Sequence, residues 1–257
     1  MLVRNILAIA GKELRSYFAS PMAYIIIGLF AAIFGFFYIA AVTWFADASA
    51  GMGFRSGPQT MNINQDLIRP VLLNATVVML FLLPMVTMRS YAEEKRSGTM
   101  ELLLTTPLTD LQIIVGKFLG AVGLYAAMLL VTLVYIAFLF LYSTPEWKPL
   151  LAAYLGLLLL GSGFIAFGLF ISSLTRNQIV AAVGTFTLFL ILWILDWLGD
   201  QGGPTTQTVV SYLSITKHFD DFAKGIIDTK HVVFYLSFIT LGLFLTAKSV
   251  DSERWRG

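Results

Sequence analysis

The chain has 257 residues, of which 58% are hydrophobic and 12% are charged, and its formal net charge is +2. A soluble domain averages about 25% charged residues, so this composition excludes a soluble enzyme, and its high apolar content excludes a disordered chain. The charge is also too small for the basic field of a nucleic-acid binder, so we expect no nucleic-acid partner. The composition predicts a single transmembrane domain over residues 1–257.

Residues 1–20 predict an amphipathic helix that lies in the membrane interface, as an elbow before the first span. The apolar side chains that recur at helical spacing are Val3, Ile6, Leu7, Ala10, Leu14, Tyr17 and Phe18. The opposite, polar face holds Arg4, Asn5, Lys12, Glu13, Arg15 and Ser16. Ser20 is a suitable N-cap and Pro21 a suitable first residue for the next helix, so the chain turns there into the bilayer.

Six apolar stretches approach the roughly 20 residues that a helix needs to cross a bilayer. The predicted spans are 22–44, 71–88, 118–142, 150–174, 179–198 and 230–247. None alternates as a barrel strand does, so the expected fold is an all-α polytopic membrane protein with an elbow helix and six transmembrane helices. Six spans put both termini on one side, which holds eleven of the seventeen Lys and Arg residues. The positive-inside rule therefore predicts cytoplasmic termini.

The loop at about 89–117, between the second and third spans, is unusually polar. Charged residues from Arg89 onwards are followed by a leucine-rich turn. Gly98 can break a helix, Thr99 can cap the next one and Pro107 can end it, which predicts a short helix at about 99–105. From composition alone this helix is either a solvated connector on the lipid headgroups or a docking helix, since apolar residues rimmed by charge suit an interface.

Two outer loops, at 45–70 and 199–230, are long enough to hold structure of their own. The first is rich in Gly, Ser and Asn. The second carries Phe219, Phe222 and Ile226 at spacings of three and four residues. That spacing predicts an interfacial helix or a re-entrant turn on the outer side.

The sequence lacks the residues of the usual catalytic and metal sites. It has no cysteine and two histidines, and it contains neither a P-loop nor a zinc-protease motif. Gly161-Ser162-Gly163 fits close helix packing better than a serine protease, and Gly116 with Gly120 forms another packing face, for which a dimer seam is one option. The apolar cores of the spans hold no ionisable residue, which disfavours a proton-driven carrier. We expect no catalytic, cofactor-binding or metal-binding residue here.

Residues 93–104 resemble a family signature. The run Glu-Glu-Lys-Arg-Ser-Gly-Thr-Met-Glu-Leu-Leu-Leu, followed by Pro107-Leu108 and Val115-Gly116-Lys117, is similar to that of ABC-2-type transporter permeases. In that family an elbow with a Lys-Glu-Leu-Arg-like run precedes six spans, and Lys12-Glu13-Leu14-Arg15 matches it. The pattern in 213–228 resembles the gliding-motility-type branch. The resemblance covers nearly the whole chain and implies a type V exporter-like fold.

The resemblance implies a division of labour between subunits. A separate ATP-binding subunit, in two copies, binds ATP and Mg and hydrolyses the nucleotide, so this chain itself is not an enzyme and binds no cofactor. Two permease copies form the path, and the family's cargo includes lipids, lipid-linked polymers and drugs. The resemblance thus implies an exporter of a lipidic or amphipathic substrate in the bacterial inner membrane, with a periplasmic accessory protein supplying any outer domain.

The resemblance also assigns residues to coupling. Segment 93–106 becomes a coupling helix on the ATPase, and its candidate residues are Glu93, Glu94, Arg96, Gly98, Thr99, Glu101, Leu102 and Leu103. The turn Thr175-Arg176-Asn177 becomes a second contact. We expect the charged residues to fix the docking register, while Gly98 allows the break that aims the helix. Alternatively, Glu93 or Glu94 only pairs Arg89 or Lys12 on the membrane surface.

Two other functions stay open at this point. A stand-alone secondary carrier or channel would work alone in liposomes under an ion gradient. A membrane anchor of a larger envelope complex would transport nothing. A permease subunit differs from both because it co-purifies with an ATPase and is inert alone.

Overall fold

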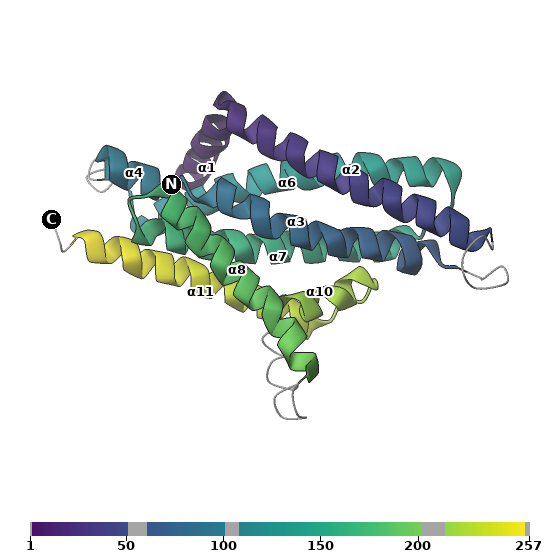
Figure 1. The fold of residues 1–257 in the computed structure, drawn as a ribbon. Coiled ribbons are helices and arrows are strands. Elements are labelled where there is room, and N and C mark those ends of the chain that lie inside the picture. The colour runs from purple at the N-terminus through teal and green to yellow at the C-terminus, as the bar shows by residue number, and fades with distance from the viewer. Residues whose placement is uncertain (1, 51–60, 101–107, 202–213, 255–257) are drawn as a thin grey trace.

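The computed structural model describes residues 2–50, 61–100, 108–201 and 214–254, and the regular elements within these ranges are helices. Figure 1 shows them as a long bundle. Their bounds are α1 Leu2–Ala19, α2 Pro21–Ser49, η1 Ile63–Ile68, α3 Arg69–Thr87, α4 Ala92–Ser97, α6 Asp110–Tyr142, α7 Trp147–Leu174, α8 Gln178–Gln201, α10 Ile215–Ala223 and α11 Thr229–Arg254.

Among the described residues, six helical segments are long and apolar enough to cross a membrane. They are α2, the continuous segment η1–α3–α4, α6, α7, α8 and α11. The predicted fold class is confirmed, and the protein is a multi-pass membrane protein. The start of α1 and the last turns of α11 both lie towards the left of Figure 1. We call the end of the bundle with α1, α4 and the last turns of α11 the terminal end, and the opposite end, with η1 and α10, the far end.

Several helices are longer than the charge-free stretches that predicted them. α6 begins at Asp110 rather than near 118, because Thr109 and Gln112 form a capping box. The described loop before α6 is therefore shorter than 89–117, and Lys117 belongs to the helix. α11 continues to Arg254, beyond the expected end at 247, because polar residues extend the helix past its apolar part.

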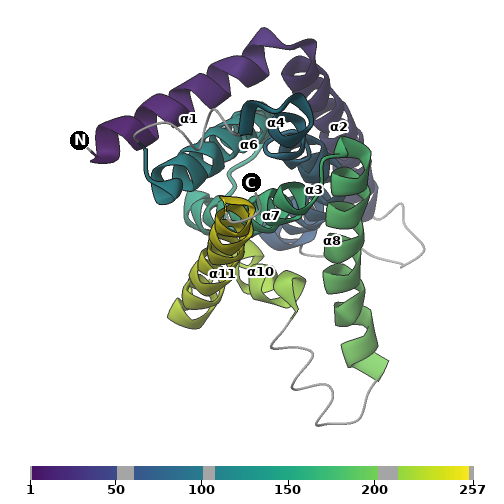
Figure 2. The same ribbon diagram turned by 90° about the vertical axis from the view of Figure 1, so that its left-hand side faces the viewer.

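The two central helices are α3 and α7. In their most apolar stretches, 67% and 61% of the residues are buried inside the protein, against 17% for α8 and α11. Figure 2 views the bundle along its length, with α7 in the middle and α8 and α11 diverging on either side of it. Gly161 lies against Tyr125 and Gly163 against Phe238, so the Gly-Ser-Gly run serves close packing, as predicted.

The elbow helix α1 runs across the terminal end of the bundle (Figure 2) and packs on α6. A Cβ added to Gly116 would lie 2.6 Å from the Ile9 side chain, and one added to Gly120 would lie 2.6 Å from the Cβ of Glu13. Only glycine allows the two helices to approach so closely. The G-x-x-x-G face of α6 therefore receives α1 of the same chain, and the dimer seam considered for it is wrong.

We expect Gly116→Leu to displace α1 and to destabilise the protein by about 1–3 kcal/mol, since the added side chain overpacks the contact with Ile9. Because the chain has no cysteine, a single Leu14→Cys thiol on α1 can report the displacement by faster maleimide labelling. Gly28→Leu is the matched control, since nothing lies within 4 Å of a Cβ at Gly28. Equal labelling rates in both variants would refute the packing argument.

Candidate functional site

The short helix α4 carries the predicted coupling residues that the structure describes. Glu93 and Glu94 lie in its first turn and Lys95 and Arg96 in its last, which suits the helix dipole. The helix ends at Gly98, whose φ of 73° lies in the left-handed region that favours glycine. The helix break predicted at this glycine is therefore confirmed.

The start of α4 is fixed to the last turn of α7. The hydroxyl of Ser172 accepts hydrogen bonds from the backbone N–H groups of Tyr91 (3.1 Å) and Ala92 (3.2 Å). The same hydroxyl donates to the carbonyl of Met88 at 3.0 Å. One buried serine thus joins the end of α3, the start of α4 and the end of α7.

A buried ammonium group connects α4 to the elbow helix. The Nζ of Lys117 lies 2.6 Å from Oε1 of Glu94 and 3.1 Å from Oε1 of Glu13, and it donates to the carbonyl of Ser90 at 2.9 Å. Only 2% of the Lys117 side chain is exposed. The ring of Tyr91 lies 5.1 Å from the ammonium group. We call Lys117, Glu13 and Glu94 the elbow ion cluster; it ties together α1, α4 and α6.

The next residue of α4 points to the other side of the bundle. The Nζ of Lys95 donates to the carbonyl of Ser173, at the end of α7, and lies 2.8 Å from Oε1 of Glu253 in α11. Ser249 of α11 donates to the same carbonyl at 3.3 Å. Consecutive residues of α4, Glu94 and Lys95, therefore anchor it to opposite halves of the bundle.

An open groove brings two predicted contact regions together. Arg96 of α4 lines a cavity of about 470 Å³ together with residues of the α7–α8 turn and the start of α8. These residues are Thr175, Arg176, Asn177 and Ile179. Two local hydrogen bonds shape the turn: the side chain of Thr175 accepts from the N–H of Asn177 (3.1 Å), and that of Asn177 accepts from the N–H of Ile179 (2.9 Å). Two exposed guanidinium groups make this terminal groove basic.

The other predicted coupling residues differ in their exposure. Glu93, Gly98 and Thr99 are exposed, whereas Glu94 is half-buried in the elbow ion cluster. Glu94 pairs there with Lys117, and not with Arg89 or Lys12, the surface partners that the alternative interpretation proposes. Glu101, Leu102 and Leu103 lie outside the described residues.

The elbow residues divide between the two faces of α1. Lys12 and Arg15 are exposed on α1, as predicted, but Glu13 turns from the expected polar face towards α6. The glycines of α6 leave room for the Glu13 side chain, and Lys117 supplies the opposite charge. A lysine next to a G-x-x-x-G face was the sequence signal for this contact.

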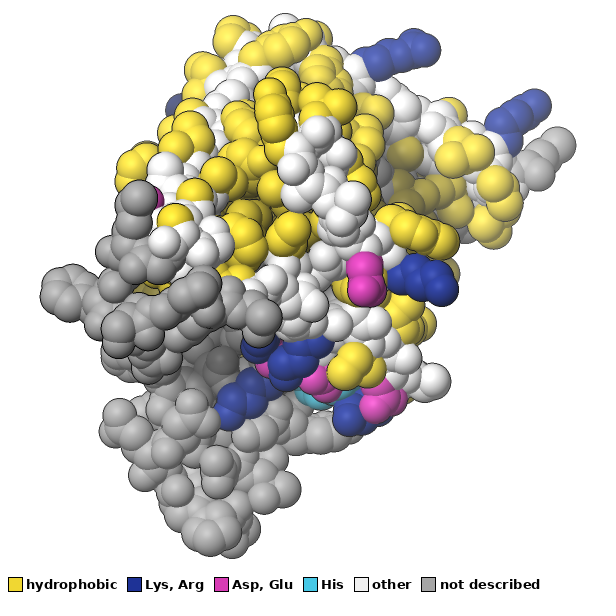
Figure 3. Space-filling view, turned by 90° about the vertical axis from the view of Figure 1, so that its right-hand side faces the viewer, with side chains coloured by type: hydrophobic (Ala, Val, Ile, Leu, Met, Phe, Trp, Pro, Cys, Tyr) yellow, Lys and Arg dark blue, Asp and Glu magenta, His cyan; other side chains and the backbone are white. Residues whose placement is uncertain are grey.

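The far end carries a second group of charged residues, which Figure 3 shows gathered on that face. Arg69 and Lys224 both pair with Asp220, each at 2.5 Å. Burial alone would raise the pKa of the Asp220 carboxyl, but the hydrogen bonds from Lys224 and Arg69 outweigh it and hold this pKa below its usual value. The stabilisation is present above the ordinary Asp pKa of about 3.9 and is lost as the pH falls through the lowered pKa.

The helix predicted in the outer loop is α10, with Phe219 and Phe222 buried. Ile226 is exposed, because α10 ends before Gly225 (φ 87°) and the spacing does not continue. His218 of α10 and His231 of α11 face each other, with their Nδ1 atoms 2.5 Å apart. Among the described residues, no three His, Cys, Asp or Glu side chains are placed to hold a metal ion.

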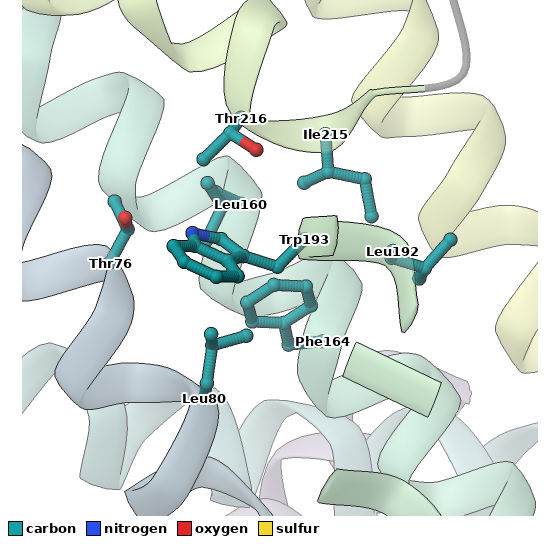
Figure 4. Close-up of a pocket in the computed structure, with 8 residues that line it drawn as sticks. All are labelled: Thr76, Leu80, Leu160, Phe164, Leu192, Trp193, Ile215 and Thr216. Atoms are coloured by element: carbon teal, nitrogen blue, oxygen red, sulfur yellow. The ribbon is translucent and has the colours of Figure 1, made fainter. Parts of the chain in front are cut away.

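A small cavity lies in the core between α3, α7, α8 and α10 (Figure 4). The rings of Trp193 and Phe164 lie close together in its lining, and Thr76 and Thr216 contribute hydroxyl groups. Its volume is about 10 Å³, the lower limit for a single water molecule. This cavity is too small for a transported substrate.

Comparison with known proteins agrees with this architecture. A family model described as "ABC-2 family transporter protein" matches residues 5–247. The chain is 31% identical over 143 residues to "Probable multidrug ABC transporter permease YbhR" of Escherichia coli (strain K12), which covers 55% of this chain and 38% of that protein. It is 32% identical over 171 residues to "Probable ABC transporter permease protein NosY" of Pseudomonas aeruginosa, covering 61% of this chain and 58% of that protein. The chain therefore matches less than two thirds of either relative's length.

Proposed function

The chain belongs to the ABC-2 family of transporter proteins, and from this membership we propose that it is the permease subunit of an ATP-binding-cassette exporter. In this proposal the terminal end faces the cytoplasm and binds a separate ATP-binding subunit, present in two copies. That partner binds ATP and Mg and hydrolyses the nucleotide. This chain receives the movement and passes it to the membrane helices.

The observation that carries the proposal is the terminal groove. Arg96 and the turn 175–177 are far apart in the sequence, yet they line the same open cavity. Exposed guanidinium groups recognise carboxylates well, since they present several donors in a planar fork. We therefore propose that Arg96 and Arg176 contact an acidic edge of the ATP-binding subunit.

The contacts that anchor α4 would transmit a movement of the docked ATP-binding subunit to the membrane helices. α4 follows the central helix α3 through residues 88–91, and Ser172 holds that connection to α7. Lys95 joins α4 to α11, and the elbow ion cluster joins it to α1 and α6. A displacement of α4 by the partner therefore pulls on five neighbouring helices at once.

The proposal also covers the path and the cargo. The core cavity between α3, α7, α8 and α10 is too small for a substrate, and we propose from the family membership that two permease copies form the path between them. The apolar surfaces of the spans suit a lipidic or amphipathic cargo, and the name of the Escherichia coli relative, a probable multidrug permease, is consistent with this. We place the complex in a bacterial inner membrane, with both termini inside and a periplasmic accessory protein as a further partner.

Purification of the tagged chain from its native membrane tests the proposal. An ATP-hydrolysing subunit should co-purify at equal stoichiometry, and Arg96→Glu or Arg176→Glu should reduce its recovery by about tenfold or more. Lys148→Glu, the same charge reversal at an exposed far-end residue, is the control and should change nothing.

A preparation without an ATPase would contradict the proposal. Transport by the chain alone in liposomes under an ion gradient would then favour a secondary carrier. No transport under either condition would favour a membrane anchor.

A further inference from the structure

A polar cavity of about 280 Å³ lies inside the elbow, between α1, the start of α2 and α4. Charged residues of both signs line it: Lys12, Arg89 and Lys117, against Glu13, Glu93 and Glu94. The formal charges of these six side chains cancel. The cavity is separate from the terminal groove, which none of these residues lines.

Two buried polar atoms of the lining have no hydrogen-bond partner. They are Nε of Arg89, which is a donor, and Oε2 of Glu94, which is an acceptor. Buried polar groups in proteins are nearly always paired, so each atom points to a missing group. Both atoms have almost no accessible surface, so an occupant of the cavity reaches them only when the Arg89 and Glu94 side chains rotate towards it. An occupant that satisfies both must offer an acceptor to Arg89 and a donor to Glu94.

The surroundings place the cavity at the level of the lipid headgroups. α1 exposes Leu2, Val3 and Leu7 while it lies across the end of the bundle. Tyr24, in the first turn of α2, is exposed and packs edge-on against Phe18. Exposed aromatic side chains of this kind gather at membrane–water interfaces.

We propose that the elbow cavity binds the headgroup of a phospholipid with a primary amine, of the phosphatidylethanolamine class. Its phosphate accepts from Arg89 and Lys12, and its ammonium group donates to the free oxygen of Glu94 and to Glu93. A headgroup without net charge matches a lining whose charges cancel. A trimethylated choline headgroup has no N–H to donate, and a glycerol headgroup adds a net negative charge beside three carboxylates.

This inference goes beyond the proposed function, because it requires neither an ATP-binding partner nor transport. The lipid would contact α1 and α4 together. Its headgroup therefore adds a second connection between the elbow and α4, beside the elbow ion cluster.

Lipid retention by the wild-type chain is the first test and needs no variant. Bound lipid is first removed from the tagged protein in detergent. The protein is then mixed with phosphatidylethanolamine, its N-monomethyl or N,N-dimethyl derivative, or phosphatidylcholine, all with the same acyl chains. Native mass spectrometry measures how much of each lipid the protein retains. We expect one retained ethanolamine lipid per chain, with retention falling at each methylation to about one tenth for choline. Equal retention along the series, better retention of phosphatidylglycerol, or a cavity that retains no lipid would each overturn the proposal.

Two further arms locate the site and its source. Arg89→Met should reduce retention of the ethanolamine lipid about tenfold, whereas Arg4→Met, at an exposed residue of α1 outside the cavity, should leave it unchanged. Equal effects of the two substitutions would place the lipid elsewhere. Soluble phosphoethanolamine shares the headgroup chemistry without the acyl chains, so we expect it to bind much more weakly, and equal binding would overturn the assignment to a lipid.

Discussion

Replacing Lys117 with methionine should lower the free energy of unfolding by about 3 kcal/mol, because it leaves the Glu13 and Glu94 carboxylates half-buried without their counter-charge. The size follows from burial, since only 2% of the Lys117 side chain is exposed, in contrast to a surface ion pair. A loss of thermal stability in detergent, with release of α1 reported by the Leu14→Cys thiol, is the measurement.

The effect should depend on charge rather than on the lost side-chain volume. Adding Glu13→Gln and Glu94→Gln to Lys117→Met replaces all three charges by neutral groups of similar size, so most of the stability should return. Glu94→Gln alone should cost less than Lys117→Met, since Lys117 keeps Glu13. If the triple variant is no more stable than Lys117→Met alone, the ion cluster is not the cause.

Gly98→Val should abolish stimulation of the partner ATPase while it leaves the isolated chain nearly as stable as the wild type. Valine in the left-handed region costs about 1–2 kcal/mol, so the chain at Gly98 should adopt another conformation and leave α4 in a different direction. The cause is the backbone angle alone, since nothing lies within 4 Å of a Cβ built at this glycine. ATPase and transport assays on the purified complex measure the result.

Gly98→Asn is the matched control, because asparagine adopts the left-handed conformation far more readily than valine. Stimulation should therefore survive largely intact in Gly98→Asn. This prediction rests on the proposed function. Normal transport by the Gly98→Val complex would remove Gly98 from the coupling mechanism without disturbing the family assignment.

The features that the sequence predicted well are those set by neighbouring residues. The six spans follow from uninterrupted apolar length, and the elbow from Ser20-Pro21, whose N-cap hydroxyl and first-turn proline the structure confirms. The break after α4 follows from Gly98. The resemblance to ABC-2 permeases is confirmed as well, because its motifs are also local. The roles in coupling, the gliding-motility-type likeness and the exporter direction stay predictions.

The features that the sequence did not reveal depend on tertiary contacts. Amphipathic spacing placed Glu13 with Lys12 and Arg15, because the pattern records a helix face but not the groups that lie opposite it. The sequence pattern predicts that Lys117 ends a loop, since a charge interrupts an apolar run, yet a buried lysine is tolerated where carboxylates surround it. Nothing in the local pattern could show that Arg96 and residues 175–177 share one groove.

The dependence of the elbow on α6 also sets an order of events during synthesis. Glu13 and Lys117 are separated by 104 positions in the chain, which a ribosome adds in about 5–20 s at ordinary rates of translation. Throughout that interval α1 lacks both the glycine face of α6 on which it packs and the ammonium group of Lys117 that pairs with Glu13. The elbow can therefore dock only after α6 has been synthesised, so the first helix of the chain reaches its final position later than the two spans that directly follow it.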